Sequence, residues 1–359
     1  MEEKLKGEED IRMFVGAKSG VVMPAQSASQ ALFRLINDAV KHFPGTNIVT
    51  TKAEHISVYD ATFSAAEANC KEWRVAPFSK EDGCVHLGDI IDLVDKNTSV
   101  LALVHAANIT GGFLNIATII KEARGINNKI CVIVDGVQYI PHGVIDWEKI
   151  GNPDAYVIAP YKAGGIKGTA FAILSESFSV IPHDKVIGKP KNDWDLGTIG
   201  HTNYAAWSSL VDHYCWIGSH FTTSVDRRQQ IIAGMASIRA HEIALLERLF
   251  YGTKNNIGLK ELSDCRKINL FFINEKDLIN RGCLISYNIS ELNATKAVKS
   301  YLDSGILVQN RTSNVYSKHI LDEIGVDEII RFSAGHFNSP NEIDRFLEVT
   351  LKICETKKN

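Results

Sequence analysis

An aspartate and a lysine each follow a short apolar segment of this chain, and together they could do chemistry at one site. The segments ICVIV and AYVIA are rich in β-branched or small apolar residues, which is typical of strands that helices cover on both faces. The first runs into Asp135, with Gln138 three residues later, and the second leads through Tyr161 into Lys162. We expect these polar side chains at one edge of an α/β sheet, where ligands usually bind.

A carboxylate and a lysine so placed fit the needs of pyridoxal 5'-phosphate (PLP). This cofactor forms a Schiff base with a lysine, and an acid at its pyridinium nitrogen keeps the ring an electron sink. Asp135 fits the acid, Gln138 could bond the ring hydroxyl, and Lys162 fits the Schiff base. The same residue types also have plainer roles, because an aspartate after a strand often caps a helix and most lysines are solvated. Lys167 is a second candidate lysine, but it lies inside the glycine-rich loop, whereas Lys162 directly follows the strand.

Three further segments place polar residues where a cofactor or a substrate could bind. Ser27 and Gln30 have the spacing of a capping box, which predicts a helix start whose N–H groups could cradle a phosphate. His55 comes just past the predicted strand NIVTT and could stack on an aromatic cofactor. Arg331 lies in the predicted strand EIIRFSAG, where an arginine facing a cleft would clamp a carboxylate. Each could equally be an ordinary helix cap, surface histidine or surface arginine.

Strands and helices alternate from residue 47 to residue 174, which is the pattern of a parallel sheet. A long helix-periodic stretch follows and is broken near Gly218. Beyond it, the segments INLFFI, CLISYNI and GILVQ predict strands of a smaller α+β domain. We predict an N-terminal segment over residues 1–20, with residues 1–10 solvated, a large domain over 21–250 and a small C-terminal domain over 256–359.

The composition excludes several classes of protein. The 359 residues are 45% hydrophobic and 23% charged with a net charge of -3, so we expect neither nucleic acid nor a membrane as partner. No apolar run is long enough to span a bilayer, and the acidic start is unlike a secretory signal. Seven scattered cysteines without a CxxC pair argue against a disulfide framework or a metal centre and favour a cytoplasmic protein. No GxGxxG follows a strand, which argues against a nicotinamide enzyme.

Taken together and in order, these segments resemble the class V family of PLP-dependent enzymes, which includes cysteine desulfurases, kynureninases and related aminotransferases. TTKAEH is similar to the family's Glu-His motif, HAANITG to its Asn-bearing loop, and VDGVQYIPHGVIDWEKIGNPDAYVIAPYKAGGIKG to its Asp-x-x-Gln to Lys segment. DLGTIGHTNYAAW and RFSAGHFNSPNEIDRFL resemble its Glu-x-Gly-Thr and closing Arg segments. The resemblance implies a fold type I α/β protein with a mainly parallel sheet in its large domain and a smaller C-terminal α+β domain. It also implies a homodimer whose site lies at the subunit interface.

The resemblance implies a role for each candidate residue. Lys162 would form the Schiff base and move the proton at the substrate α-carbon, while Asp135 would keep the ring nitrogen protonated and Gln138 would bond the ring oxygen. Arg331 would bind the α-carboxylate of a small amino-acid substrate. The remaining implied contacts are His55 on the ring face, Asn108 at the ring or the substrate carboxylate, Ala28 and Ser29 at the phosphate, Tyr161 beside the lysine, and Thr198 at the phosphate of a second subunit.

The chain departs from the desulfurase pattern in three respects. Desulfurases have a histidine directly before the lysine and usually a serine two residues earlier, where this chain has Tyr161 and Ala159, as in a Pro-Tyr-Lys subfamily. Ala159 removes a hydroxyl from the phosphate site, which lowers the expected cofactor affinity. No cysteine follows Arg311 in the segment NRTSNVYSKHIL, although persulfide formation needs a thiolate there. The chain also begins later in the family pattern than its relatives, which suggests a truncated N-terminal arm.

Two functional hypotheses follow. The first is an enzyme that removes the α-proton of a small amino acid and then transaminates it, epimerises it or eliminates from its β-carbon, for example by carbon–sulfur cleavage. No residue in the sequence chooses among these outcomes. The second is a catalytically degenerate or truncated member of the fold that acts as a binding or partner protein.

Overall fold

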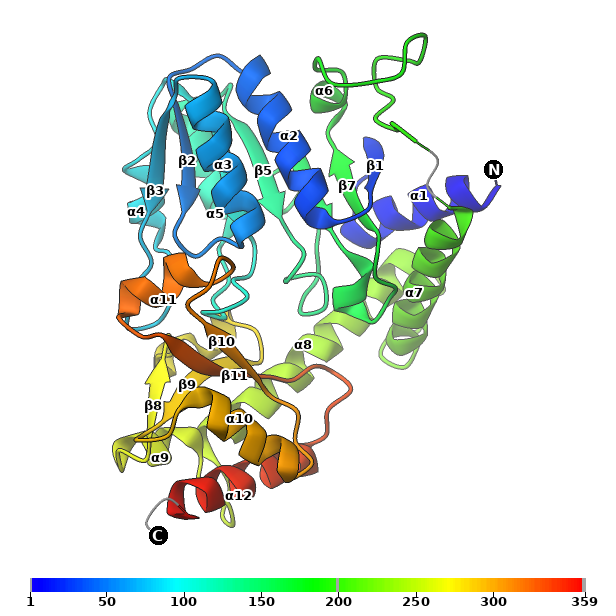
Figure 1. The fold of residues 1–359 in the computed structure, drawn as a ribbon. Coiled ribbons are helices and arrows are strands. Elements are labelled where there is room, and N and C mark those ends of the chain that lie inside the picture. The colour runs from blue at the N-terminus through cyan, green and yellow to red at the C-terminus, as the bar shows by residue number, and fades with distance from the viewer. Residues whose placement is uncertain (1, 198–199, 357–359) are drawn as a thin grey trace. The chain divides into compact units, whose positions relative to one another are not determined.

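The computed structural model describes residues 2–197 and 200–356, which form two compact units (Figure 1). Unit 1 comprises the described residues up to Pro77 together with Val85–His105 and Leu114–Ser237. Unit 2 comprises Phe78–Cys84, Ala106–Phe113 and the described residues from Ile238 onward. Three segments of the predicted large domain therefore group with unit 2, namely the two short ones and residues 238–250. The domain limits expected from the sequence remain a prediction.

Unit 1 is built on a sheet that has seven strands in the described part of the chain, in the order β1-β7-β6-β5-β4-β2-β3. The strands are β1 Val21–Ala25, β2 Asn47–Thr51, β3 Glu72–Ala76, β4 Thr98–Val104, β5 Cys131–Asp135, β6 Ala155–Ile158 and β7 Ala170–Leu174. Strands β2 to β6 pair in parallel, whereas β7 runs antiparallel to both β6 and β1. Every residue of β2, β4, β5, β6 and β7 is buried. This burial explains the continuous apolar character of β6 and β7 and of β5 before its last residue, and the predicted mainly parallel sheet is confirmed.

Two helices, α2 (Ala28–His42) and α3 (Ile56–Ala68), pack side by side over one face of this sheet (Figure 1). The apolar face of α2 contributes a buried row that joins the sheet core, including Leu32, Leu35 and Ile36. The predicted helix start is confirmed, because the Ser27 side chain accepts a hydrogen bond from the Gln30 backbone N–H at 3.2 Å. The described helical segments between α3 and residue 197 are α4 Leu87–Ile91, α5 Ile116–Ile126, the 3-10 turn η1 Pro160–Ala163 and α6 Glu176–Ser179.

The N-terminal helix corrects part of one prediction, because residues 1–10 were expected to be solvated and frayed. The structure has a helix from Glu2 in which Gly7 and Asp10 are buried, while five of the nine described residues are exposed as expected. Helix α1 spans Glu2–Val15 and packs against α7 (His201–Ser219), with Phe14 in edge contact with Trp207 at 5.5 Å between ring centroids. The buried Asp10 accepts a hydrogen bond from Arg227 at 2.6 Å. These partners lie about 200 residues away in the sequence, so local charge density could not predict them.

The long helical stretch breaks where the sequence predicts, since α7 ends at Ser219 and α8 spans Arg227–Tyr251. The division between the units falls within α8. No described helix of the chain is both long and apolar enough to cross a membrane.

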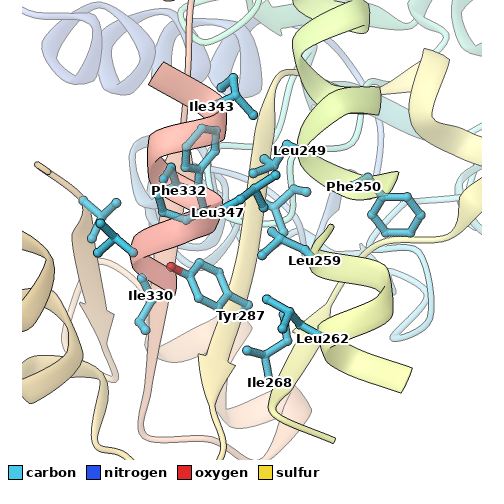
Figure 2. Close-up of a cluster of buried hydrophobic side chains, with 14 of the residues drawn as sticks. Leu249, Phe250, Leu259, Leu262, Ile268, Tyr287, Ile330, Phe332, Ile343 and Leu347 are labelled. Atoms are coloured by element: carbon cyan, nitrogen blue, oxygen red, sulfur yellow. The ribbon is translucent and has the colours of Figure 1, made fainter. Parts of the chain in front are cut away.

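Unit 2 contains an antiparallel sheet with four strands in its described residues, in the order β10-β11-β9-β8. Leu259, Tyr287, Phe332 and Leu347 belong to the apolar cluster that fills its core (Figure 2). The elements are α9 Leu259–Asp264, β8 Ile268–Phe271, η2 Glu275–Asn280, β9 Leu284–Ile289, α10 Ala294–Asp303, β10 Gln309–Thr312, α11 Lys318–Ile324, β11 Glu328–Ser333 and α12 Pro340–Thr356.

The predicted strand GILVQ is wrong in its position. The strand is Gln309–Thr312, whereas residues 306–308 connect α10 to it. Strand pairing decides this shift, because β11 pairs with Gln309 to Thr312 and not with the apolar residues before them. The polar residues of β10, which include Arg311, are therefore the ones that the sheet holds in place.

Candidate active site

Four polar residues of unit 1 lie at or just after the ends of parallel strands. His55 lies four residues after β2, His105 directly follows β4, Asp135 ends β5, and Lys162 lies in the turn after β6. Because the carboxyl ends of parallel strands meet at the same edge of a sheet, these side chains gather at one edge. This is the edge at which the sequence predicts a ligand site.

Lys162 is held in a short, well-defined turn. The turn η1 follows β6 directly and ends at Gly164, whose φ of 91° lies in the left-handed region. The Lys162 amine donates a hydrogen bond to Oε1 of Gln138 at 2.8 Å. The hydroxyl of Tyr214 on α7 donates to the Ala163 carbonyl at 3.2 Å. The structure therefore brings together the lysine and the glutamine that the sequence pairs.

Asp135 lies deep beside this pair, with only 4% of its surface exposed. Its Oδ1 accepts a hydrogen bond from the Val137 backbone N–H at 3.0 Å. Burial raises the pKa of Asp135 to about 6, although the Val137 hydrogen bond and the charge of Lys162 oppose the rise. Burying the ionised carboxylate of Asp135 by itself is costly. A protonated nitrogen beside it lowers that cost, because a buried charge with an opposite charge next to it is far less costly than a lone one.

A second acid lies near Asp135. Glu54 is fully buried and accepts a hydrogen bond from the Thr51 hydroxyl at 2.7 Å. Burial raises the pKa of Glu54 to about 8, and the charge of Asp135 adds to the rise. Glu54 is therefore mainly protonated at neutral pH, which leaves Asp135 as the ionised acid of the two. Glu54 was not assigned a role of its own from the sequence.

His105 forms an aromatic platform that sequence reasoning missed. Its ring stacks on Tyr139 with 3.5 Å between centroids and 6° between planes. Its Nδ1 lies 2.7 Å from the hydroxyl of Tyr156 on β6. Burial lowers the pKa of His105 to about 3, so the ring is neutral. A signal was present, because His105 ends the apolar run SVLALVH as Asp135 ends its own run.

The starts of α2 and α3 bring the phosphate candidates close to His55. The Ser29 hydroxyl lies 2.6 Å from the Ser57 hydroxyl, which in turn lies 2.8 Å from Nδ1 of His55. His55 is the N-cap of α3 and accepts a hydrogen bond from the Ser57 backbone N–H. Ala28 and Ser29 occupy the first turn of α2, whose N–H groups have no partner within the helix. Ser57 is a further residue that the sequence did not single out.

Arg331 and Asn108 meet within unit 2. Nη1 of Arg331 donates to the Asn108 backbone carbonyl at 2.9 Å. The next two carbonyls of this loop are also held, since Ser286 donates to Ile109 and Arg281 donates to Thr110, both at 2.8 Å. Three consecutive carbonyls are thus fixed by side chains of the same unit, which gives the Asn108 loop a defined backbone.

Two candidate residues remain. Tyr161 is 41% exposed, with the Lys162 amine 5.6 Å from its ring centroid. Thr198 lies outside the described residues.

The residues of unit 1 fit PLP in their chemistry. A lysine for the Schiff base, a buried acid for the ring nitrogen and an amide for the ring oxygen lie together at the strand ends. A helix N-terminus with a serine beside it suits a phosphate.

Comparison with known proteins identifies the family. Residues 3–194 match the family model described as Aminotransferase class-V. The chain belongs to the class V aminotransferase family. It is accordingly a PLP-dependent enzyme of the cysteine desulfurase-like kind, as the motifs predict.

Several curated relatives span most of the chain. It is 27% identical to a cysteine desulfurase of Wigglesworthia glossinidia brevipalpis, over 97% of this chain and 82% of the relative. The chain is 28% identical to a cysteine desulfurase of Pectobacterium carotovorum subsp. carotovorum, over 96% of this chain and 81% of the relative. An aminotransferase-like protein of Gibberella zeae is 24% identical, over 93% and 79%.

Solved structures show the same fold. A cysteine desulfurase from Thermococcus onnurineus NA1 in its apo form superposes with a TM-score of 0.78 at 18% identity, covering 99% of this chain and 85% of that one. The cysteine desulfurase CsdA from Escherichia coli gives a TM-score of 0.79 at 16% identity, covering 99% and 84%. The predicted fold type I architecture is confirmed.

Proposed function

We propose that this enzyme removes the α-proton of a small amino acid and that Lys162 is the base. The observation that carries this proposal is the contact between the Lys162 amine and Gln138, next to the buried Asp135. Bound PLP would supply an electron sink for the carbanion that proton removal leaves. Cysteine is the first substrate to test, because several relatives are named cysteine desulfurases.

Each residue of the site would act on a stated group. Asp135 would hold a proton on the ring nitrogen, since its own burial favours an adjacent positive charge. Gln138 would bond the ring oxygen, and Lys162 Nζ would take the α-proton and return it. Arg331 would hold the substrate α-carboxylate through its guanidinium, whose fork fits a carboxylate.

The remaining predicted contacts would orient the cofactor. His55 would lie on the ring face, where its hydrogen bond to Ser57 fixes the imidazole. Ser29 and the first N–H groups of α2 would hold the phosphate. Asn108 would contact the ring or the substrate carboxylate, and Tyr161 would flank the lysine.

Sulfur transfer through a persulfide is the less favoured outcome. The segment from Arg311 to Ile324 contains no cysteine, so it offers no thiolate to attack a substrate sulfur. Direct β-elimination, transamination and epimerisation all begin with removal of the α-proton and need no thiolate of the enzyme, so each stays open. The products separate them: pyruvate with sulfide for elimination, a keto acid with an aminated cofactor for transamination, and the opposite enantiomer for epimerisation.

A homodimer is part of the proposal. Trp216, Phe221 and Val225 expose large apolar surfaces at the end of α7 and in the loop after it, and such clustered surface favours an interface. Thr198 would contact the cofactor phosphate bound by the second subunit. A mass of one chain in light scattering at micromolar concentration would contradict the dimer. The cytoplasmic location expected from the cysteines also remains a prediction.

The decisive experiment is the visible absorbance spectrum of the purified protein with and without added PLP, beside Lys162→Ala. We expect a band in the parent that borohydride abolishes and that Lys162→Ala lacks. Lys167→Ala is the matched control and should keep the band. Absence of the band in the parent with excess PLP would contradict the proposal and favour a non-catalytic binding protein.

A further inference from the structure

Arg311 and Arg331 form a pair of like charges in the sheet of unit 2. Arg331 on β11 lies opposite Gln309 on β10, and Arg311 is two residues beyond Gln309. Side chains two residues apart on a strand share one face, so Arg311 and Arg331 are diagonal neighbours with about 7–8 Å between their backbones. This distance lets two long guanidinium side chains reach groups on one small ligand.

Neither arginine is neutralised in the part of the chain that the structure describes. The Nε atom of each is buried and has no hydrogen-bond partner there, and neither side chain forms an ion pair. Burial lowers the pKa of Arg311. Burial, followed by the charge of Arg311, lowers the pKa of Arg331 to about 10. Two adjacent, partly buried cations without a counter-charge among the described residues are costly, which indicates that an anion completes them.

Two other buried charged side chains among the described residues have protein partners. Arg281 in the same unit donates to the carbonyls of Phe272, Thr110 and Leu284. In unit 1 the buried Asp10 is paired with Arg227. Arg311 and Arg331 differ from these in that two arginines lie on one face of the sheet without an ion pair in the described part of the chain.

We infer that Arg311 and Arg331 together bind an amino acid that carries a second acidic group on its side chain. The inference rests on the proposed function, in which Arg331 holds the α-carboxylate. A substrate with a single carboxylate neutralises only one of the two guanidiniums. A side-chain carboxylate held by Arg311 neutralises the other, and the planar fork of each guanidinium suits a carboxylate.

Aspartate and asparagine provide a matched pair of probes, because they differ in the charge of the side chain and hardly in size. Each is titrated into the PLP-loaded protein, and binding is followed by the change in the cofactor absorbance. We expect L-aspartate to bind the parent at least about tenfold more tightly than L-asparagine. Arg311→Gln should abolish this preference while leaving asparagine affinity within about twofold, and Arg311→Lys should restore part of it. Arg345→Gln, which removes an exposed arginine of α12, should change neither affinity.

A second readout does not depend on the cofactor. Succinate, which has two carboxylates and no amine, should raise the midpoint of thermal unfolding of the Lys162→Ala protein, and Arg311→Gln added to Lys162→Ala should remove that increase. The increase should persist even if no cofactor band forms, so failure of the proposed function is distinguishable from failure of this inference. Equal binding of aspartate and asparagine by the parent, or equal weakening of both by Arg311→Gln, would overturn it.

Discussion

The ring of His105 lies parallel to that of Tyr139, with 3.5 Å between their centroids, at the carboxyl ends of the parallel strands. The same histidine contacts the Tyr156 hydroxyl through Nδ1. His105 is buried and neutral, so its contribution is packing and hydrogen bonding and not charge. The three side chains form a packed layer next to Asp135. A backbone hydrogen bond also joins the two strand ends, because the His105 N–H donates to the Asp135 carbonyl at 2.8 Å.

Tyr156→Phe should destabilise the protein. The change removes the hydroxyl that lies 2.7 Å from Nδ1 of His105 and leaves a buried ring nitrogen without this partner. A buried polar group that loses its partner costs about 1–3 kcal/mol, so the urea midpoint followed by circular dichroism should fall. Tyr251→Phe, at a half-exposed position of α8, should change the free energy of unfolding by less than about 0.5 kcal/mol. Equal effects of the two changes would rule out this role for the Tyr156 hydroxyl.

Gly136→Ala should be more damaging than its small size suggests. A methyl group built on Gly136 would lie 2.1 Å from Cε1 of the fully buried Tyr156, which has no room to withdraw. We expect a loss of roughly 1–3 kcal/mol, as for other overpacked cores, and weaker PLP binding because Asp135 is the adjacent residue. Gly125→Ala is the control, because nothing lies within 4 Å of its added methyl group on α5. That change should be neutral or stabilising. A Gly136→Ala protein as stable as the parent would show that this glycine is not required for packing.

The positions of the strand ends could be predicted because they depend on local sequence. Short apolar runs identify buried strands, and in a parallel sheet the residues after each run must share an edge. Lys162, Gln138 and Asp135 were found in this way. The layer around His105 was not, because the Tyr156 hydroxyl lies 51 residues along the chain from its partner. No spacing rule connects residues so far apart.

Two elements depart from their predictions, one in part and one in position, for the same physical reason. The charged residues of α1 suggested a solvated start, but packing against α7 and the ion pair of Asp10 with Arg227 stabilise the helix from Glu2. The polar strand β10 was placed too early because the apolar residues before it look more like a strand, whereas its position is set by pairing with β11. Tertiary contacts override local preference in both cases.

Glu54→Gln should flatten the dependence of stability on pH. Burial raises the pKa of Glu54 from its usual 4.5 to about 8, so between these values the unfolded chain releases a proton that the folded chain keeps. The free energy of unfolding of the parent should therefore fall as pH rises from 5 to 8, by on the order of 3 kcal/mol from this group. Glutamine has the same shape and no ionisable group, so urea unfolding of Glu54→Gln at pH 5, 6.5 and 8 should show a smaller slope.

Glu67 supplies the control for this series, because it is exposed and lies on α3, the helix that begins just after Glu54. Glu67→Gln removes a carboxyl group of identical chemistry at a solvated position, so it should leave the slope of the parent unchanged. A parent whose stability does not fall between pH 5 and pH 8, or a Glu54→Gln protein with the full slope of the parent, would contradict the assignment of a protonated, buried Glu54.

Asp135→Asn should separate cofactor binding from proton removal. Lys162 and the α2 N-terminus are unchanged, so the visible cofactor band should persist, whereas an amide cannot stabilise a positive charge on the ring nitrogen. Exchange of the α-proton of L-alanine in deuterated buffer, followed by NMR, reports proton removal whatever reaction comes next. We expect this exchange to slow by at least about 100-fold in Asp135→Asn. Asp92→Asn, at an exposed position after α4, should exchange at the parent rate. If Asp135→Asn kept the exchange rate of the parent, Asp135 would not be the acid that supports catalysis, and Glu54 would become the next acid to test.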